Sequence, residues 1–175
     1  MEIAILSKKT IRIKGKQATL LIDPDTTIKT MIPTDGVLFL EPYEKTLLSK
    51  VEGHRVVIKG PGEYEVGGIK ISGFASGKNV AYSLLVDGVH IGLVQTTDLE
   101  KAKEKLTDEH IILLSSSESV DQAFLTALAP KVLIAYGEKA GEVLKTVGSE
   151  AKTLNKYATT VEKLPAEMET VLLTA

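Results

Sequence analysis

The chain has 175 residues, a formal net charge of −2 at pH 7 and a pI near 6.0. This length is typical of one compact domain, and we expect a single domain over residues 1–175. The small net charge gives no bulk attraction to nucleic acid or to an anionic membrane. The absence of cysteine excludes disulfides, thiolate zinc sites and cysteine nucleophiles.

The N-terminal segment and the aromatic content give two further expectations. Residues 1–15 contain no apolar run long enough for a signal peptide or a membrane span, so we expect a cytoplasmic protein. Aromatic residues make up only 5% of the chain and tryptophan is absent, so the core is expected to be aliphatic.

Short apolar segments predict strands throughout the first half. Residues 10–14 alternate between apolar and polar as a half-buried strand does, whereas residues 37–40 are continuously apolar as in a buried strand. Pro24 and Pro42 end two of these segments, because proline lacks the amide donor that strand pairing needs. The expected strands cover residues 2–6, 10–14, 18–22, 37–40 and 55–58.

Two glycine-containing dipeptides predict tight hairpins. Gly67-Gly68 and Asp87-Gly88 each separate two strand-like runs, and both accept the positive φ angles of a type I′ turn. The paired strands are expected at residues 63–66 with 69–71 and at residues 80–86 with 89–94.

The second half alternates between strand and helix patterns. Ser119 is the expected N-cap of a helix that Pro130 ends, and Gly148 is expected to end the next helix. Helices are expected at residues 99–105, 120–129 and 137–147, and strands at residues 110–114, 132–135 and 170–174. A strand-rich half followed by strand–helix alternation indicates sheets with helices packed outside them.

Four segments together resemble the metallo-β-lactamase superfamily, most closely its zinc-dependent hydrolase branch. They are Ile11–Pro24, Gly60–Gly73, Tyr82–Val94 and Leu128–Ile134, of which Gly60–Gly73 is the most specific. The resemblance extends over nearly the whole chain. It implies an α+β fold, a metallo-β-lactamase-like four-layer αββα sandwich in reduced form, with two mixed sheets face to face.

The metal ligands that the resemblance implies are missing from this chain. The signature His-x-His-x-Asp-His would fall in the loop after the strand at residues 37–40, but that loop reads Glu41-Pro42-Tyr43-Glu44-Lys45. The other ligand positions fall at Ser7-Lys8, residues 75–78, Gln95-Thr96 and Tyr136-Gly137. The chain has only three histidines, and none of them occupies a ligand position. Zinc needs three or four converging ligands before it activates a water molecule.

We therefore assign no catalytic, cofactor-binding or metal-ligating residue. The side chains expected at the vestigial pocket are Glu41, Tyr43, Glu44, Thr96, Asp98, Ser115 and Tyr136. Glu41 and Glu44 are carboxylates of the kind that hard cations prefer, but Lys45 next to them is able to neutralise the pair. Ser115 begins a serine run with no histidine placed to activate it, and Tyr136 is expected to fill the space of a metal.

The three histidines, His54, His90 and His110, are each expected to be structural. His54 lies in a predicted loop beside Gly53, and His90 faces away from its apolar strand neighbours. His110 begins a buried strand after a run of polar residues.

The function expected from these observations is that of a non-catalytic binding or interaction module with a metallo-β-lactamase-like fold. Its partner is an unidentified protein or small molecule, with no nucleic acid and no membrane expected. One alternative is a metal-dependent hydrolase with a site rebuilt from Glu41, Glu44 and Asp98. A second alternative is a structural subunit that forms homo-oligomers through edge strands rich in valine and isoleucine.

Overall fold

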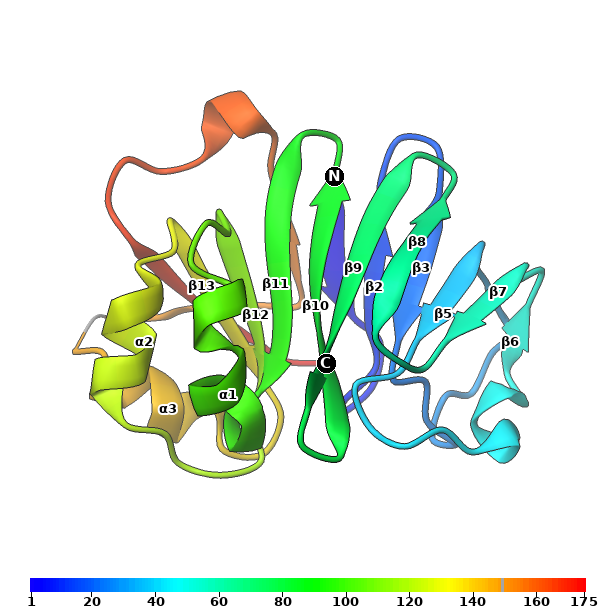
Figure 1. Cartoon of the computed structure of the whole chain (residues 1–175), viewed down its shortest axis with the longest axis horizontal. Helices are drawn as coiled ribbons and strands as arrows, with labels where there is room; N and C mark the ends of the chain where they lie inside the picture. The colour runs from blue at the N-terminus through cyan, green and yellow to red at the C-terminus, as the bar shows by residue number, and fades with distance from the viewer. Residues whose placement is uncertain (149) are drawn as a thin grey trace.

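Two mixed β-sheets pack face to face in the computed structural model, which describes residues 1–148 and 150–175 (Figure 1). The six-stranded sheet has the order β15-β1-β2-β3-β5-β7, and the eight-stranded sheet has the order β14-β16-β13-β12-β11-β10-β9-β8. The first contains β1 (Glu2–Ile5), β2 (Ile11–Lys14), β3 (Thr19–Ile22), β5 (Gly36–Leu38), β7 (Val56–Ile58) and β15 (Lys156–Ala158). The second contains β8 (Gly62–Val66), β9 (Ile69–Ser76), β10 (Asn79–Val86), β11 (Val89–Gln95), β12 (Ile111–Ser115), β13 (Val132–Tyr136), β14 (Lys152–Leu154) and β16 (Glu169–Leu173).

Strand alternation places an aliphatic core between the sheets. Ile11 and Ile13 of β2 point into it from one side, and Ile91 and Leu93 of β11 point into it from the other, all with no exposed surface. Full burial of each such side chain contributes roughly 1.5–3 kcal/mol, so this shared layer is the main source of the sandwich's stability. The aliphatic core expected from the composition is therefore present.

The α-helices of the described residues lie outside the eight-stranded sheet, beside β11, β12 and β13 (Figure 1). They are α1 (Leu99–Ala102), α2 (Gln122–Leu128) and α3 (Ala140–Thr146), and 3₁₀ turns η2 (Thr96–Asp98) and η3 (Lys103–Lys105) flank α1. A second apolar cluster fills the space between them and the sheet, with Val94, Ile112 and Leu125 among its members. No helix within residues 1–148 and 150–175 is long and apolar enough to cross a membrane.

The start of α2 differs from the sequence expectation. Asp121, not Ser119, caps it, and its carboxylate accepts a hydrogen bond from the Ala123 amide at 2.8 Å. The helix begins later than the apolar pattern indicated, so Ser119 lies outside the first turn and has no free helical amide to cap. The end of the helix was predicted correctly: Ala129 takes a left-handed φ of 42°, and Pro130 follows it.

The outer face of the six-stranded sheet has a much thinner cover. A 3₁₀ turn, η1 (Lys45–Leu48), and a two-stranded ribbon of β4 (Ile32–Pro33) and β6 (Val51–Glu52) supply residues that pack over Leu21 and Val37. Elsewhere on this sheet the polar side chains form ion pairs, Arg12 to Glu2 at 3.2 Å and Lys156 to Glu2 at 3.5 Å. The reduced form of the sandwich is therefore most evident on this face.

Both predicted hairpins are confirmed as type I′ turns. The φ angles are 52° and 84° at Gly67 and Gly68, and 51° and 84° at Asp87 and Gly88. Gly67 is under a second constraint, because a Cβ atom there would lie 2.6 Å from the Cβ of Ala18. These turns fix the register of β8 on β9 and of β10 on β11.

Candidate functional site

A hollow of about 320 Å³ opens at the end of the sandwich where β12 and β13 finish. We call this end the pocket end. Side chains of both sheets contribute to it: the hollow is lined by Lys8, Lys9, Asp25, Thr27, Glu41, Ser115, Ser116, Ser117, Gly137 and Glu138. The carboxyl ends of neighbouring parallel strands meet at one edge of a sheet, which brings Ser115 of β12 beside the residues that follow β13.

Asp25 is held by hydroxyl groups of three residues. Its Oδ2 accepts hydrogen bonds from the hydroxyls of Ser7 and Thr10, and its Oδ1 accepts one from the Thr27 amide at 2.7 Å and one from the Thr27 hydroxyl. Burial raises the pKa of Asp25, but these hydrogen bonds outweigh burial and the pKa is below its ordinary value. Asp25 is therefore an ionised carboxylate with both oxygens engaged.

Asp23 lies deeper and behaves in the opposite way. It follows β3 with a left-handed φ of 43°, and its Oδ1 accepts a hydrogen bond from the Leu40 amide at 2.9 Å. This bond fixes the start of the loop that carries Glu41. Burial is the main reason that the pKa of Asp23 rises to about 7, and the negative charge of Glu41 adds to it.

A lysine and a glutamate form the ion pair at the mouth of the hollow. The Nζ of Lys9, in the turn between β1 and β2, lies 2.9 Å from Oε2 of Glu41. Burial lowers the pKa of Lys9, but the hydrogen bond and charge of Glu41 raise it by more, with the charges of Asp23 and Asp25 acting in the same direction. Lys9 is therefore an ammonium group whose ion pair is with Glu41.

The eight-stranded sheet supplies a more tightly packed wall. The Ser116 amide donates to the Tyr136 carbonyl at 2.8 Å, and a Cβ atom at Gly137 would lie 2.9 Å from the Ser116 carbonyl oxygen. Gly137 has a φ of 99°, so glycine is required there both by conformation and by the close approach. Beneath this wall Tyr136 has no exposed surface, and burial together with the charge of Asp23 raises the pKa of its hydroxyl.

A buried amide and carboxylate network adjoins the hollow at the end of β11. The Asn79 amide donates to Asp98 Oδ2 at 2.6 Å and to Gln95 Oε1 at 3.2 Å, and the Thr97 hydroxyl donates to Asp98 at 2.9 Å. The Gln95 Nε2 group is buried and has no hydrogen-bond partner among residues 1–148 and 150–175. Thr96 points toward the serine run and accepts the amides of Ser117 and Glu118 at 3.3 Å.

The structure brings only some of the predicted pocket residues together. Glu41 and Ser115 line the hollow, and Tyr136 lies beneath it. Thr96 and Asp98 lie in the adjoining network and do not line it. Their positions as vestigial pocket residues stay predictions.

Tyr43 and Glu44 lie outside the hollow, contrary to expectation. After Pro42 the chain passes onto the outer face of the six-stranded sheet, where Tyr43 packs edge-on against Phe39 with ring centroids 5.1 Å apart and Lys59 lies over its ring. Glu44 is exposed where η1 begins. Both residues were expected at the vestigial pocket, but Tyr43 instead covers an apolar sheet face.

Sequence reasoning missed four residues that build this site, Lys9, Asp23, Asp25 and Thr27, and marked Ser7 only as an altered ligand position. A signal for two of them is present, since Asp23-Pro24-Asp25 places two carboxylates directly after a buried strand. No local signal marks Ser7 or Lys9, whose roles depend on the turn that brings them against a distant loop.

The histidines lie away from the hollow. His90 is exposed on β11, and its amide donates to Nδ1 of His110 at 3.1 Å, with the rings in edge-on contact at 5.3 Å. Burial lowers the pKa of His110, with the charges of His90 and Lys131 adding to the effect. His54 is half-buried in the loop before β7. None of the three lines the pocket end.

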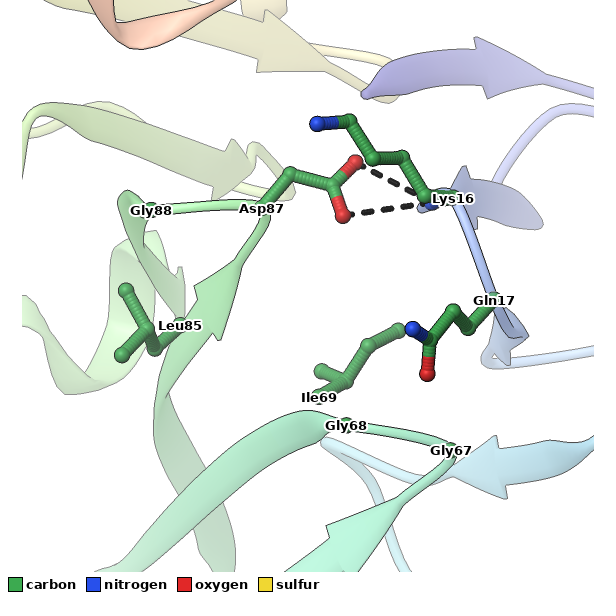
Figure 2. Close-up of a pocket in the computed structure, with 8 residues that line it drawn as sticks. All are labelled: Lys16, Gln17, Gly67, Gly68, Ile69, Leu85, Asp87 and Gly88. Carbon is green, nitrogen blue, oxygen red and sulfur yellow. Dashed lines mark hydrogen bonds between the residues drawn. The ribbon is translucent and has the colours of Figure 1, made fainter.

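A second hollow, of about 230 Å³, lies at the opposite end of the sandwich, which we call the turn end. The turns at residues 15–18, 67–68 and 87–88 surround it, and Figure 2 shows the Gln17 amide and Ile69 facing one another across it. The Asp87 carboxylate accepts two bonds from the Lys16 amide, at 3.1 and 3.2 Å, and so joins turns of the two sheets (Figure 2). This hollow is a gap between turns, without the carboxylate cluster of the pocket end.

Comparison with solved structures identifies the fold. A candidate zinc-dependent hydrolase of the metallo-β-lactamase superfamily from Thermotoga maritima matches with a TM-score of 0.75 and 19% identity over 98% of this chain and 97% of its own. A candidate metal-dependent hydrolase from Parabacteroides distasonis matches with a TM-score of 0.61 and 13% identity, over 97% of this chain and 91% of its own. An isothiocyanate hydrolase from Delia radicum gut bacteria matches with a TM-score of 0.56 and 11% identity, over 83% of this chain and 91% of its own. No family model and no curated protein matches the sequence. The chain has the metallo-β-lactamase fold, which confirms the resemblance of its sequence.

The residues at the pocket end do not fit a zinc ion. No histidine lines the hollow, both oxygens of Asp25 already accept hydrogen bonds, and Glu41 is paired with the ammonium group of Lys9. Within the described ranges, no group of three or more histidine, aspartate or glutamate side chains is arranged to hold a metal ion. Zinc binds most readily to several converging imidazole or carboxylate groups with free lone pairs.

Proposed function

We propose that this chain is a non-catalytic protein of the metallo-β-lactamase fold that acts in the cytoplasm as a binding module. Its ligand is a small polar molecule held at the pocket end. The single observation that supports this proposal best is the engagement of the hollow's own charged groups. Asp25 accepts bonds from three residues, and Glu41 is bound by Lys9, so neither is available to hold a metal ion.

The residues that line the hollow include donors and acceptors that a small polar ligand would use. Ser115 and Ser117 bring side-chain hydroxyl groups to the lining, and Lys8 and Glu138 add one charge of each sign. A ligand with several hydroxyl, amino or carboxyl groups would find both donors and acceptors there. Nucleic acid and membranes are not proposed as partners.

The hydrolase alternative has less support. Solved structures with this fold include hydrolases, and by analogy the chain would need Glu41, Glu44 and Asp98 around one ion. Glu41 lines the hollow, Glu44 lies at the start of η1, and Asp98 is bonded to Asn79 and Thr97. The three carboxylates therefore belong to three separate local structures, which does not favour a shared ion.

The homo-oligomer alternative also lacks a suitable surface at the hollow. The large apolar side chains that are exposed, within the part of the chain described, are Met31, Val161 and Met168. None of them lines the hollow, so the exposed apolar side chains do not mark the pocket end as an interface.

The test combines metal content, turnover and ligand binding. Mass spectrometry of the untagged protein and calorimetric titration with Zn²⁺ and Mn²⁺ should give no stoichiometric metal, and a chromogenic phosphodiester, thioester and β-lactam should not be hydrolysed. Titration with small hydroxy acids, amino acids and sugars should shift the amide NMR signals of residues 115–117. One metal per chain at micromolar affinity, with turnover lost in Glu41→Gln, would establish the hydrolase alternative.

A further inference from the structure

The eight-stranded sheet ends in β8, and no strand of residues 1–148 and 150–175 pairs with its outer edge (Figure 1). The turn at Gly67-Gly68 determines which backbone groups lie along that edge. In a tight turn the residue before the turn bonds the residue after it, so Val66 and Ile69 form a hydrogen-bonded pair. Such pairs alternate along antiparallel strands, so the amide and carbonyl groups of Glu63 and Glu65 point away from β9.

Two amide donors and two carbonyl acceptors are therefore presented along the outer edge of β8. Within the described ranges, no other segment forms backbone hydrogen bonds with them. The strand is five residues long and contains no proline. A row of unpaired groups of this kind is a template for one further strand, because the added strand gains hydrogen bonds without any rearrangement of the sheet.

The side chains beside these free backbone groups are acidic. Glu63 and Glu65 are exposed on the outer face of the sheet, whereas Tyr64 between them packs against the core. The Glu63 carboxylate accepts a hydrogen bond from the Ser72 hydroxyl at 2.7 Å, and Lys70 lies opposite Glu65 on β9. Neither glutamate forms an ion pair with any residue of the described part of the chain.

The edge strands at the opposite ends of the two sheets are different. Lys152 of β14 forms an ion pair with Glu169 at 2.9 Å, and Lys156 of β15 forms one with Glu2 at 3.5 Å. Both glutamates belong to the strand that pairs with the edge strand concerned. The edge lysines are therefore paired within their own sheets, whereas the charges of β8 are left for a partner.

The charges of β8 also oppose its pairing with a second copy of itself. An antiparallel pair that uses the outward backbone groups places Glu63 or Glu65 of one copy opposite Glu63 or Glu65 of the other. Like charges directly opposite each other destabilise a strand pair, whereas opposite charges stabilise it. Because side chains alternate along a strand, a complementary strand has its two basic residues separated by one residue.

We propose that β8 is a docking edge for another protein, which adds an extended segment to the sheet as a ninth, antiparallel strand. The segment carries lysine or arginine opposite Glu63 and Glu65, with a β-branched residue between them on the side of Tyr64. Backbone hydrogen bonds hold the segment, and the two charge pairs select the partner and its register. No residue of β8 lines the hollow at the pocket end, so this surface is separate from the proposed ligand site.

The experiment is a titration of the full chain with two synthetic peptides, TKVKVT and TEVEVT, each labelled with a neutral fluorophore and followed by fluorescence anisotropy. The basic peptide should bind at least about tenfold more tightly, because two cross-strand pairs change from like to opposite charge. Hydrogen exchange measured by NMR locates the site. Exchange of the Glu63 and Glu65 amides should slow at least about tenfold with the basic peptide, whereas the Tyr64 amide, already bonded to β9, should not change.

Three variants separate the backbone contribution from the charges. Glu65→Pro removes one outward amide but no bond to β9, and an edge strand tolerates proline there, so it should bind the basic peptide at least about tenfold more weakly. Glu63→Gln combined with Glu65→Gln keeps both backbone amides and should remove the preference between the peptides. This double variant carries the test should Glu65→Pro fold poorly, as judged by circular dichroism. Glu104→Gln, at an exposed glutamate of η3, is the matched control and should bind like the unaltered protein.

The outcomes separate this proposal from the proposed function. Equal binding of the two peptides, no binding of either at millimolar concentration, or NMR shifts confined to residues 115–117 would overturn the docking edge and leave the ligand site at the pocket end untouched. A dimer of the unaltered protein in light scattering that Glu65→Pro abolishes would show that a second copy occupies β8, and it would overturn the proposal as well.

Discussion

At the pocket end of the sandwich, hydrogen bonds and an ion pair between side chains fix the loops, whereas at the turn end the backbone conformation fixes the turns. Asp25, Ser7 and Lys9 make contacts that depend on charge and on hydroxyl groups. Gly67 and Asp87 depend on positive φ angles and close packing. A network of carboxylates and hydroxyl groups bonded to one another is therefore a feature of the pocket end, whereas glycine conformation fixes the turns at the other end.

The largest effect expected from this difference is a pH dependence that originates at Asp23. The pKa of its carboxyl is about 7 in the fold and 3.8 as the ordinary value, so the folded chain keeps a proton that the unfolded chain loses. Stability is therefore fully present below pH 3.8 and is lost as the pH rises toward and through 7, by up to roughly 4 kcal/mol. Asp23→Asn should remove most of this slope while it keeps an oxygen for the Leu40 amide.

Urea unfolding at pH 5 and at pH 8 measures this slope in both proteins. Asp25→Asn is the matched comparison, because the pKa of Asp25 is lowered and its contribution to stability is lost only as the pH falls below the ordinary carboxyl range. Equal free energies of unfolding at the two pH values in the unaltered protein would show that Asp23 is ionised without penalty.

The next effect tests the turn end. Gly67→Ala should lower the free energy of unfolding by about 2 kcal/mol, because the new Cβ overlaps Ala18 and alanine is strained at a φ of 52°. Gly148→Ala has a positive φ of 77° but no atom within 4 Å of the new Cβ, so it should cost about half as much. Gly141→Ala, inside α3 with open space around it, should stabilise by roughly 0.5–1 kcal/mol.

Thermal and urea unfolding of the three alanine variants rank these effects. A loss at Gly148→Ala as large as that at Gly67→Ala would show that backbone strain alone, and not the contact with Ala18, makes glycine necessary in the turn.

The two ends also differ in how much of them the sequence predicts. Asp87-Gly88 and Gly67-Gly68 specify their own turns, so local chemistry alone predicted these hairpins and the strands β10 and β11. β14 and β15, by contrast, were missed. They are short strands of three residues with little apolar alternation, and they are ordered by pairing with β16 and β1, which are remote in the sequence.

The candidate site was predicted in part for the same reason. Ser115 and Tyr136 directly follow predicted strands, and neighbouring parallel strands bring their ends together, so both could be placed from the sequence. The partnership of Lys9 with Glu41 joins residues 32 positions apart and depends on two loops meeting. The resemblance gave the loop after residue 40 as a pocket wall, but Tyr43 packs instead on an apolar sheet face that short loops must cover.

A smaller effect tests the hydroxyl network of the pocket end. Thr27→Val keeps the shape of the side chain and its amide bond to Asp25 but removes one hydroxyl donor. We expect the free energy of unfolding to fall by about 1 kcal/mol. We also expect the pKa of Asp25 to rise, as measured from the pH titration of its carboxyl carbon by NMR. Thr126→Val, at an exposed helix hydroxyl that bonds the Gln122 carbonyl, is the control and should leave Asp25 unchanged. An unaltered titration of Asp25 in Thr27→Val would mean that the other donors suffice.

The smallest expected effect is a pH dependence of stability that originates at His110, at the turn end. Its direction is opposite to that expected from Asp23. His110 lies where β12 begins, and its Nδ1 accepts the His90 amide, so protonation removes that bond and meets the nearby charges of His90 and Lys131. Because the pKa of His110 is lowered in the fold, its contribution to stability is present above pH 6.5 and is lost as the pH falls through the folded pKa. His110→Asn keeps an acceptor without a titrating proton, so in an Asp23→Asn background it should flatten the remaining dependence between pH 5 and 8. A dependence that persists in the double variant would place the second titrating group elsewhere than in this histidine pair.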